Sequence, residues 1–584
     1  MQVTTSDRPW GGIILVLVAI AVLAGIHQIF LVRAEPDALY MDSLRLLFQF
    51  DQWQAGRLST LDFWGGSSHR GFINQLALWA NVSLFNLDVL LVNRLTGMVI
   101  AAVAVVVSLA WLADMRKVAP HGSWLGHAIV GIVLAMLCFS WAGYELLTLD
   151  LGLPLWTKNL AFLLYFWGQA QLLSGGAKHP RVLGICLTVA APLIVLICGM
   201  GWNYAFVGAV IAVQAFSFLP PVRAPGRWAA LGPNTILVLS MVVYLLGGSV
   251  TDASTSNGLN TESRVPVLIL YAVGSSLGNP EALLAGRFPL EMIAILGGAI
   301  ALVGVVAGML WVRRGAPGSR LPLLLALYGV LVAASLALAR GADGPSGVMA
   351  SRYYMDLTFG LMGVIWLAAR EVPAFVRHAV AGRMVVVAMI VTVVCGHVIT
   401  YRHEWKVSPY RAALFDQMNR ALQLGVPNEE SAQLLQSPMD HARKGLAVMR
   451  SRRLAMFSGD ERAECSTAAI GYGQGWHSPE GEVRWSGAVA EMDLPPCGCA
   501  YFADMYVPEG QPERQVLIKG SDGEQALAIG PGQSARARLG NDRVELDVTP
   551  VLVPSRDLTG SQDGRELGVL LAGVSVNCEA PGVE

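Results

Sequence analysis

The sequence predicts a polytopic α-helical membrane domain of about eleven transmembrane helices, followed by a soluble, mainly-β domain with a sandwich fold. The chain of 584 residues is 54% hydrophobic and only 14% charged, and its mean hydropathy is +0.51. Soluble domains carry about 25% charged residues, so this composition indicates a membrane protein. The formal net charge of −1 gives no reason to expect a nucleic-acid partner.

Apolar runs long enough to cross ~30 Å of hydrocarbon recur through the first 400 positions. The expected spans are Gly12–Val32, Thr96–Ala113, Leu125–Trp141, Leu160–Leu173, Val182–Met200, Ala205–Leu219, Thr235–Leu246, Pro289–Trp311, Leu321–Leu338, Tyr354–Ala369 and Met384–Thr400. The odd number places the two termini on opposite sides. The first run exceeds the ~7–15 residues of a signal-peptide core, which favours a retained anchor over a cleaved signal.

Along the chain, short loops rich in basic residues alternate with short loops that have few of them. One set of loops contains Arg8, Arg116, Lys117, Lys178, Arg181, Arg223, Arg227, Arg313, Arg314, Arg320, Arg370, Arg377 and Arg383. The loops between them carry only scattered single bases. Because Lys and Arg collect in cytoplasmic loops, we expect a cytoplasmic N-terminus, with residues 33–94 and everything after Tyr401 on the outer side.

The first outer loop, residues 33–94, is a polar, acidic segment between two apolar runs. It places Asp37, Asp42, Asp51 and Asp62 near Trp53, Trp64, His69 and Arg70. The stretches 41–58 and 73–85 have apolar residues at helical spacing, so we expect two amphipathic helices with their apolar faces on the membrane interface. Anchoring explains their leucines, but it does not explain the four aspartates.

Two further outer loops add polar residues to the same face. The loop after the third span brings Glu145, Asp150 and Lys158, and the last short outer loop brings Arg352 and Tyr353. A carrier needs polar groups near the membrane midplane, whereas an enzyme acting on a lipid headgroup needs them at the ends of spans. The distribution therefore favours a surface enzyme over a carrier.

Beyond residue 400 the pattern changes. Residues 402–460 are expected to form a helical connector, and residues 461–584 show short alternating runs broken by Gly and Pro, which predict an antiparallel β-sandwich. Residues 1–401 form the membrane domain in this division. Four of the eight cysteines, Cys465, Cys497, Cys499 and Cys578, fall in the outer domain, and this even number predicts two disulfides there.

Sugar transfer from a polyprenyl phosphate needs a base for the acceptor hydroxyl, cations for the departing phosphate and aromatic faces for the sugar. The candidates are Asp42 as base, Arg352, His69, Arg70, Tyr353 and Lys158 as phosphate- or donor-binding residues, and Trp53 or Trp64 as sugar-binding residues.

At these residues the chain resembles the GT-C-fold membrane glycosyltransferases. It is most similar to bacterial members whose first outer loop reads D, GxLS, D, W or F, and EHR. The matching text is Asp42, GRLS at 56–59, Asp62, Trp64, His69–Arg70, and a later SRY at 351–353. The C-terminal part is similar to their sugar-binding domains in GxxxPEG…RWSG at 475–487 and DxRELG at 563–568.

The resemblance implies a catalytic acid in the first outer loop, often joined by a second acid in the next. Asp42 is preferred, and Asp37 is the alternative because Pro36-Asp37 resembles the PD of aminoarabinose transferases at the same boundary. Glu145 and Asp150 are nearly equal candidates for the second acid. The chain departs from the pattern at Ser68, where relatives have a Glu before HR. Some GT-C enzymes use Mg²⁺ or Mn²⁺ and others use no metal, and no ligand set is readable in this sequence.

We therefore expect an inverting glycosyltransferase of the bacterial inner membrane with its site on the periplasmic face. It would move a sugar from a polyprenyl-phosphate donor to an envelope glycan, lipid or protein, and its C-terminal domain would position the acceptor. Two alternatives stay open. One is a catalytically silent envelope-glycan binding or scaffold protein, and the other is a lipid or oligosaccharide carrier.

Overall fold

A computed structural model of the chain describes most of its residues. The described ranges are 9–65, 71–120, 123–247, 264–375, 379–426, 428–458, 467, 470–481, 483–494, 499–520, 523–540, 543–558 and 561–577. The expected site residues His69 and Arg70, and the departure at Ser68, lie outside these ranges.

The chain divides into two compact units, each built from three separate segments. The first, here called the bundle unit, contains Met1–Pro36, Ser59–Ala77 and Leu90–Ala412. The second, here called the β unit, contains Asp37–Leu58, Leu78–Val89 and Ala413–Glu584. The expected first outer loop is therefore divided between the two units.

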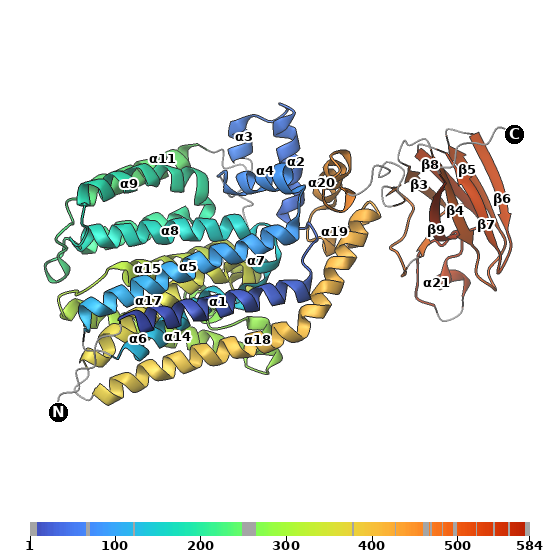
Figure 1. The fold of residues 1–584 in the computed structure, drawn as a ribbon. Helices are drawn as coiled ribbons and strands as arrows, with labels where there is room; N and C mark the ends of the chain where they lie inside the picture. The colour runs from blue at the N-terminus through green and yellow to red at the C-terminus, as the bar shows by residue number, and fades with distance from the viewer. Residues whose placement is uncertain are drawn as a thin grey trace. The chain divides into compact units, whose positions relative to one another are not determined.

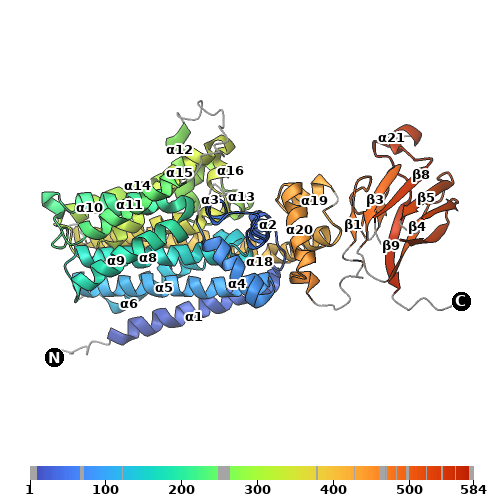
Figure 2. The same ribbon diagram turned by 90° about the horizontal axis from the view of Figure 1, so that it is seen from above.

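The bundle unit consists of helices joined by turns. Its elements are α1 (Pro9–Ala34), α3 (Thr60–Gly65), α5 (Val89–Val118), α6 (Trp124–Cys138), α7 (Tyr144–Thr148), α8 (Gly152–Leu173), α9 (Pro180–Leu193), α10 (Asn203–Phe216), α11 (Leu231–Leu246), α12 (Val265–Ser275), α13 (Pro280–Ala285), α14 (Leu290–Arg313), α15 (Leu321–Arg340), α16 (Gly344–Val348) and α17 (Tyr354–Phe375). Helices α4 (Ile73–Phe85) and α18 (Ala379–Gln423) each continue from one unit into the other. Helices α15 and α17 pack against each other; Figure 1 shows the helices of the bundle unit, and Figure 2 shows them from above.

Within the described residues, seven helices are long and apolar enough to cross a membrane. They are Trp10–Ala34, Val89–Val118, Trp124–Thr148, Pro180–Cys198, Leu290–Arg313, Leu321–Val348 and Gly382–Gln423. Three shorter apolar helices are Met200–Phe216, Leu231–Leu246 and Val265–Ser275. The expected spans in α8 and α17 are helical but do not belong to the seven. The chain therefore has the helices of a polytopic membrane protein, while eleven spans and the orientation stay predictions.

Helices α15 and α17 approach closely at small residues. A Cβ atom built on Gly329 of α15 would lie 2.3 Å from the Cα atom of Gly360 on α17, so both positions require a hydrogen in place of a side chain. One turn further along α17, a Cβ atom on Gly363 would lie 2.4 Å from the backbone N of Ala326. Small residues are typical of such contacts in membranes because they bring helix backbones together.

The helical part of the β unit is formed by α2 (Asp42–Gln54), α19 (Glu429–Leu434) and α20 (Met439–Ser451). The expected amphipathic helix is present as α2, but its apolar side chains Leu44, Leu47 and Phe50 are fully buried, and α2 packs against α20. Gly445 of α20 allows this contact, since a Cβ atom there would lie 2.6 Å from the carbonyl oxygen of Leu44. Part of the apolar face expected to contact lipid is thus covered by the chain itself.

The rest of the β unit is an antiparallel β domain with one short helix, α21 (Pro554–Asp557). Its strands are β1 (Gly471–Tyr472), β2 (Arg484–Trp485), β3 (Val489–Asp493), β4 (Ala500–Tyr506), β5 (Arg514–Gly520), β6 (Gly523–Ile529), β7 (Ser534–Leu539), β8 (Arg543–Thr549) and β9 (Leu570–Asn577). They form two sheets with the orders β1-β3-β8-β5-β6 and β2-β9-β4-β7.

Alternate residues of the central strands are buried, as the sequence pattern predicts. On β4 these are Tyr501, Ala503 and Met505, and on β8 they are Val544 and Leu546. These side chains belong to one hydrophobic core. The expected antiparallel β domain is confirmed, and its classification as a sandwich stays a prediction.

The cysteines agree in part with expectation. Cys138, Cys186, Cys198 and Cys395 of the helical region carry free thiols. Cys499 is disulfide-bonded, but the other three cysteines of the outer domain lie outside the described residues. The two expected disulfides and their pairing therefore stay a prediction.

Candidate functional site

Glu145 and Arg352 meet at one end of the bundle unit. Glu145 lies in the short helix α7, and Arg352 lies in the 3-10 turn Ser351–Tyr353 that leads into α17. The backbone N–H of Arg352 donates to Glu145 Oε2 at 2.9 Å, and Arg352 Nη1 lies 4.0 Å from Glu145 Oε1. The side chain of Glu145 is 19% exposed, and that of Arg352 is 38% exposed. Two residues from different expected outer loops are thus brought together at an accessible position.

A second set of polar residues surrounds this pair. Tyr144, next to Glu145, donates its hydroxyl to Glu281 Oε1 at 3.3 Å, and the guanidinium of Arg411 lies 3.5 Å from the centre of the Tyr144 ring. Arg411 also forms an ion pair with Glu404 at 2.8 Å. Glu281 is in α13, and Glu404 and Arg411 are in α18, so three helices meet here.

Glu404 is the most enclosed member of this set, with no exposed side-chain surface. Besides Arg411, it accepts a 2.7 Å hydrogen bond from Asn279 Nδ2, at the start of α13. The sequence analysis did not single out Glu404, Arg411 or Glu281. The seven-residue spacing of Glu404 and Arg411 would have placed both on one face of a helix, which is the available signal.

Aromatic rings lie at the same end of the bundle. The ring of Trp141 lies 4.6 Å from that of Tyr401 and is stacked 6.3 Å from that of Trp405. The guanidinium of Arg33 lies 4.6 Å from the Trp405 ring, and its Nε donates to Ser408 Oγ at 2.7 Å. The aromatic rings near Glu145 therefore come from α18 and the turn before α7.

The expected sugar-binding residue Trp64 is enclosed. Only 8% of it is exposed, its indole N–H donates to the carbonyl oxygen of Leu196 at 2.7 Å, and its ring meets that of Tyr244 edge-on at 6.0 Å. A tryptophan with a satisfied N–H and a packed ring serves the fold of this region. Its expected contact with a sugar stays a prediction.

Lys158, expected to bind a donor phosphate, is fully buried. Its Nζ lies 2.8 Å from Asp356 Oδ1 and 4.1 Å from the ring centre of Trp202. Asp356 also accepts a hydrogen bond from Tyr328. The sequence analysis did not single out Asp356, although it lies in an expected span, because only the tertiary structure shows that its partner is Lys158, 198 residues earlier.

The other expected residues of the bundle unit differ in exposure. Asp150 lies just before α8 and is only 7% exposed. Tyr353 is buried, and its ring centre lies 5.5 Å from the guanidinium of Arg352. His397 of α18 is a buried histidine whose Nδ1 lies 2.7 Å from Ser140 Oγ.

The remaining expected residues belong to the β unit. Asp42 is the first residue of α2 and forms a 3.1 Å ion pair with Arg45, with 55% of the aspartate side chain exposed. Asp37 accepts a hydrogen bond from Asn419 Nδ2 at 3.0 Å. The Trp53 ring lies 6.3 Å from that of Phe50. Asp37 and Asp42 thus have different partners within this unit.

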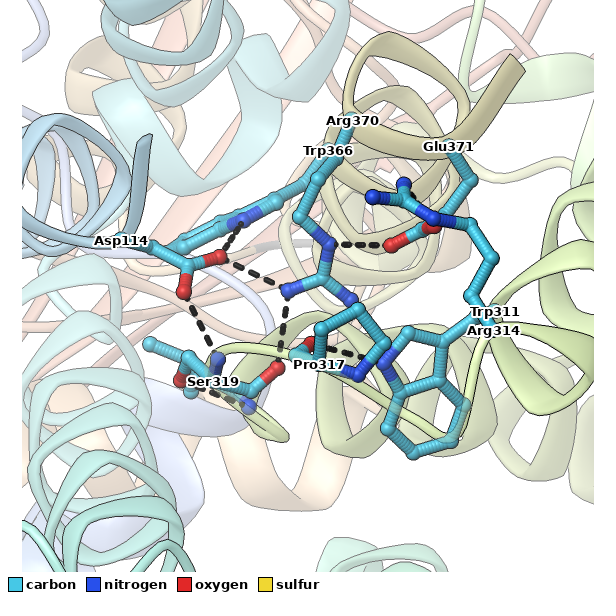
Figure 3. Close-up of polar contacts among 9 residues, drawn as sticks. Asp114, Trp311, Arg314, Pro317, Ser319, Trp366, Arg370 and Glu371 are labelled. Atoms are coloured by element: carbon cyan, nitrogen blue, oxygen red, sulfur yellow. Dashed lines mark hydrogen bonds and ion pairs between the residues drawn. The ribbon is translucent and has the colours of Figure 1, made fainter. Parts of the chain in front are cut away.

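A separate charged network lies at the other end of α17 (Figure 3). Asp114 of α5 accepts hydrogen bonds from Arg370 Nη1 at 2.8 Å, from the Trp366 indole at 2.9 Å and from the Ser319 backbone N–H at 2.7 Å. Arg370 Nε donates to Glu371 at 2.6 Å. A cavity of about 480 Å³ lies beside Asp114. Each of these carboxylates already has a basic partner, so this network holds helix ends together.

The described residues do not fit a metal ion. No group of three or more His, Cys, Asp and Glu among them could hold one. At the Glu145 end, Glu145 and Glu404 already contact arginines.

The described chain thus combines helices that are long and apolar enough to cross a membrane, a polar cluster at one end of the bundle unit, and a C-terminal antiparallel β domain. Comparisons with protein-family models, with curated proteins and with solved structures give no match to this chain.

Proposed function

We propose that this protein is an inverting membrane glycosyltransferase that moves a sugar from a polyprenyl-phosphate donor to an acceptor hydroxyl. The observation that supports this proposal is the pairing of Glu145 with Arg352. A carboxylate serves as a general base, and a guanidinium serves as a phosphate-binding cation. The two groups lie side by side, with 4.0 Å between Arg352 Nη1 and Glu145 Oε1.

In the proposed reaction, Glu145 takes the proton from the acceptor hydroxyl. The acceptor oxygen then attacks the anomeric carbon of the donor sugar, and the bond from this carbon to the phosphate oxygen breaks. The electron pair of that bond stays on the phosphate, where Arg352 stabilises the growing negative charge. A single displacement inverts the configuration at the anomeric carbon.

The contact between Glu145 and Arg352 suits this sequence of events. The short hydrogen bond to Glu145 comes from the backbone N–H of Arg352, while the guanidinium stays at the outer limit of an ion pair. The backbone bond holds the carboxylate in place whether or not the guanidinium turns towards a phosphate. Asp42 and Asp37 stay alternative candidates for the base.

Sugar incorporation into envelope glycans tests the proposal in cells that carry single variants. General bases typically contribute about 10²–10⁴-fold to rate, so Glu145→Gln is expected to reduce incorporation at least about 100-fold at normal protein abundance. Glu291→Gln is the matched control, because Glu291 is an exposed acid at the start of α14. Arg352→Gln should also lose activity, whereas Arg340→Gln, at an exposed position at the end of α15, should keep it.

The alternatives predict different results. Normal incorporation in Glu145→Gln, with loss in Asp42→Asn or Asp37→Asn, would indicate that the general base is an aspartate of the first outer loop. Normal incorporation in all three variants would indicate a catalytically silent glycan-binding protein. A carrier would move labelled lipid across vesicles that contain no acceptor.

A further inference from the structure

Arg484 of β2 is a buried cation that has no acidic partner among the described residues. Only 3% of the residue is exposed, and neither Nη1 nor Nη2 has a hydrogen-bond partner in the described part of the chain. Its guanidinium lies 4.4 Å from the ring centre of Tyr472. Burial lowers the pKa of Arg484 to about 10, which leaves it charged at neutral pH. Burying a charge without a partner lowers the stability of the fold, so an unpaired buried arginine suggests a role other than stabilisation.

Two other arginines of the β unit, the buried Arg514 and the half-buried Arg450, show the usual solution. Arg514 donates through Nε to the carbonyl oxygen of Gly568 at 3.2 Å and through Nη2 to Gln511 Oε1 at 3.2 Å. Arg450 donates through Nη2 to the carbonyl oxygens of Gln423 and Ile470. Arg514 joins its strand to Gly568 through Nε, and Arg450 joins Gln423 to Ile470 through Nη2. The two terminal nitrogens of Arg484 make no such hydrogen bonds with the described residues.

Arg484 is one of the residues that line a pocket of about 170 Å³. Arg420 and Gln423, near the end of α18, form one side of it, and Tyr472, Arg484 and Leu571 of the β domain form another. Two arginines and no acidic residue occur among the described residues that line the pocket. It therefore combines a positive lining with apolar wall surface.

The walls of the pocket are tied together. Arg450 Nη2 lies 3.1 Å from the carbonyl oxygen of Gln423 and 3.3 Å from that of Ile470, so it joins the end of α18 to the start of β1. Gly425, with φ of +88°, comes so close to β1 that a Cβ atom there would lie 3.2 Å from the Cα atom of Gly471. These contacts keep the pocket formed in the absence of a ligand.

We propose that this pocket binds the carboxylate of an acidic sugar unit, such as a hexuronate, with Arg484 as the recognising residue. The adjacent Nη1 and Nη2 atoms match the two oxygens of a carboxylate in a bidentate arrangement. The volume is below the ~300 Å³ of pockets for drug-sized ligands, which suits one sugar ring. Leu571 and Pro479 supply apolar contact for the ring. This site does not rest on the proposed glycosyl transfer.

Arg420 has a supporting role in this site. It is exposed at the edge of the pocket, where a second positive charge attracts the same anion. Because Arg420 lies at the surface, its replacement tests the site without disturbing the core of the β domain. Arg538 of β7 is the matched control, since it is an exposed arginine that does not line the pocket.

Calorimetric titration of the full-length protein in detergent with glucuronate tests the proposal. Glucuronate should bind to the native protein, and neutral glucose should not. Arg484→Gln should weaken glucuronate binding by about tenfold or more, because a charge-assisted bidentate contact is lost. Arg420→Gln should weaken it less, and Arg538→Gln should leave it unchanged. Glu145→Gln should bind glucuronate normally, which separates this site from the proposed catalytic one.

Thermal unfolding separates ligand recognition from a structural role. Arg484→Gln removes a buried charge whose terminal nitrogens have no hydrogen-bond partner among the described residues, so its melting temperature should equal or exceed that of the native protein. Absence of glucuronate binding to the native protein, or equal binding to Arg484→Gln, would overturn the proposal. Tighter binding of inorganic phosphate than of glucuronate would overturn the acidic-sugar assignment and make the pocket a phosphate site.

Discussion

Lys158 on α8 and Asp356 on α17 form an ion pair with 2.8 Å between Nζ and Oδ1, and neither side chain has exposed surface. Removing one member of a buried pair leaves an uncompensated charge, which costs about 3–5 kcal/mol. We therefore expect Lys158→Met to lower the free energy of unfolding by about that amount. Unfolding of the purified protein in detergent, followed by circular dichroism, measures the loss.

The double variant Lys158→Met with Asp356→Leu is the informative control. Replacing both members of a buried pair by apolar residues is often neutral or stabilising, so the double variant should recover most of the lost stability. A double variant that is less stable than either single variant would show that the pair itself stabilises the bundle.

The contact of Gly329 with Gly360 gives a second prediction. Gly329→Ala would place a methyl carbon 2.3 Å from the Gly360 Cα atom, so α15 and α17 would have to separate. Overpacking of this kind costs about 1–3 kcal/mol, and the melting temperature should fall. Gly308→Ala in α14 is the control, because no atom lies within 4 Å of a Cβ there. A similar melting temperature for both variants would contradict this account of the helix contact.

Arg411 is expected to act as a positioning residue for the Glu145 site. It covers the Tyr144 ring and pairs with Glu404, so it fixes the residue next to Glu145. Small displacements of a catalytic group cost up to about 100-fold in rate. We expect Arg411→Gln to reduce sugar transfer by about 10- to 100-fold, and Arg411→Lys to recover part of the activity because it keeps the charge opposite Glu404.

Measuring kcat and KM for the lipid donor separately in each variant tests this prediction. A positioning residue should change kcat more than KM for the lipid donor. Arg402→Gln, at an exposed position of the same helix, should behave like the native protein. A rise in KM at constant kcat would instead place Arg411 in direct contact with the donor.

The β domain should lose stability in acid through Asp563. Hydrogen bonds from Arg565 lower the pKa of Asp563 to about 2, below its ordinary value of 3.8. A carboxylate whose pKa is lower in the folded state stabilises the fold above the unfolded-state pKa, and this contribution is lost as the pH falls from about 4 to 2. Asp563→Asn should therefore show a weaker decline in stability across this range.

Arg565→Gln provides the companion measurement. Without the guanidinium, the pKa of Asp563 should rise towards its ordinary value, so the same part of the acid-dependent decline should disappear. Stability measured between pH 5 and pH 2 for the two variants should give similar curves. Curves that keep the native slope would show that other carboxylates control the acid response.

Local patterns in the sequence predict much of the fold. The apolar positions of residues 73–85 predict α4 with its observed bounds, and the alternation in RVELDVT predicts β8. Such patterns depend on neighbouring residues, which share one helix or one strand. Glu145 and Arg352 were each expected as site residues because each lies in a polar loop at the end of an apolar run, which is also a local pattern.

Partnerships between distant residues could not be predicted in this way. Nothing near Lys158 in the sequence identifies Asp356, and nothing near Arg484 shows that its terminal nitrogens lack a partner. The division of the first outer loop between two units also depends on α20, which lies about 400 residues later in the chain. These properties arise from tertiary packing, which a single sequence does not display.

The contact of α2 with α20 has a consequence for the making of this protein. Leu44 leaves the ribosome roughly 400 residues before Gly445, the residue against which it packs. At about 5–20 residues per second, translation of the intervening chain takes roughly 20–80 s. During that interval the apolar face of α2 cannot pack against α20. A chaperone or the translocation machinery must therefore protect this face until α20 has been synthesised.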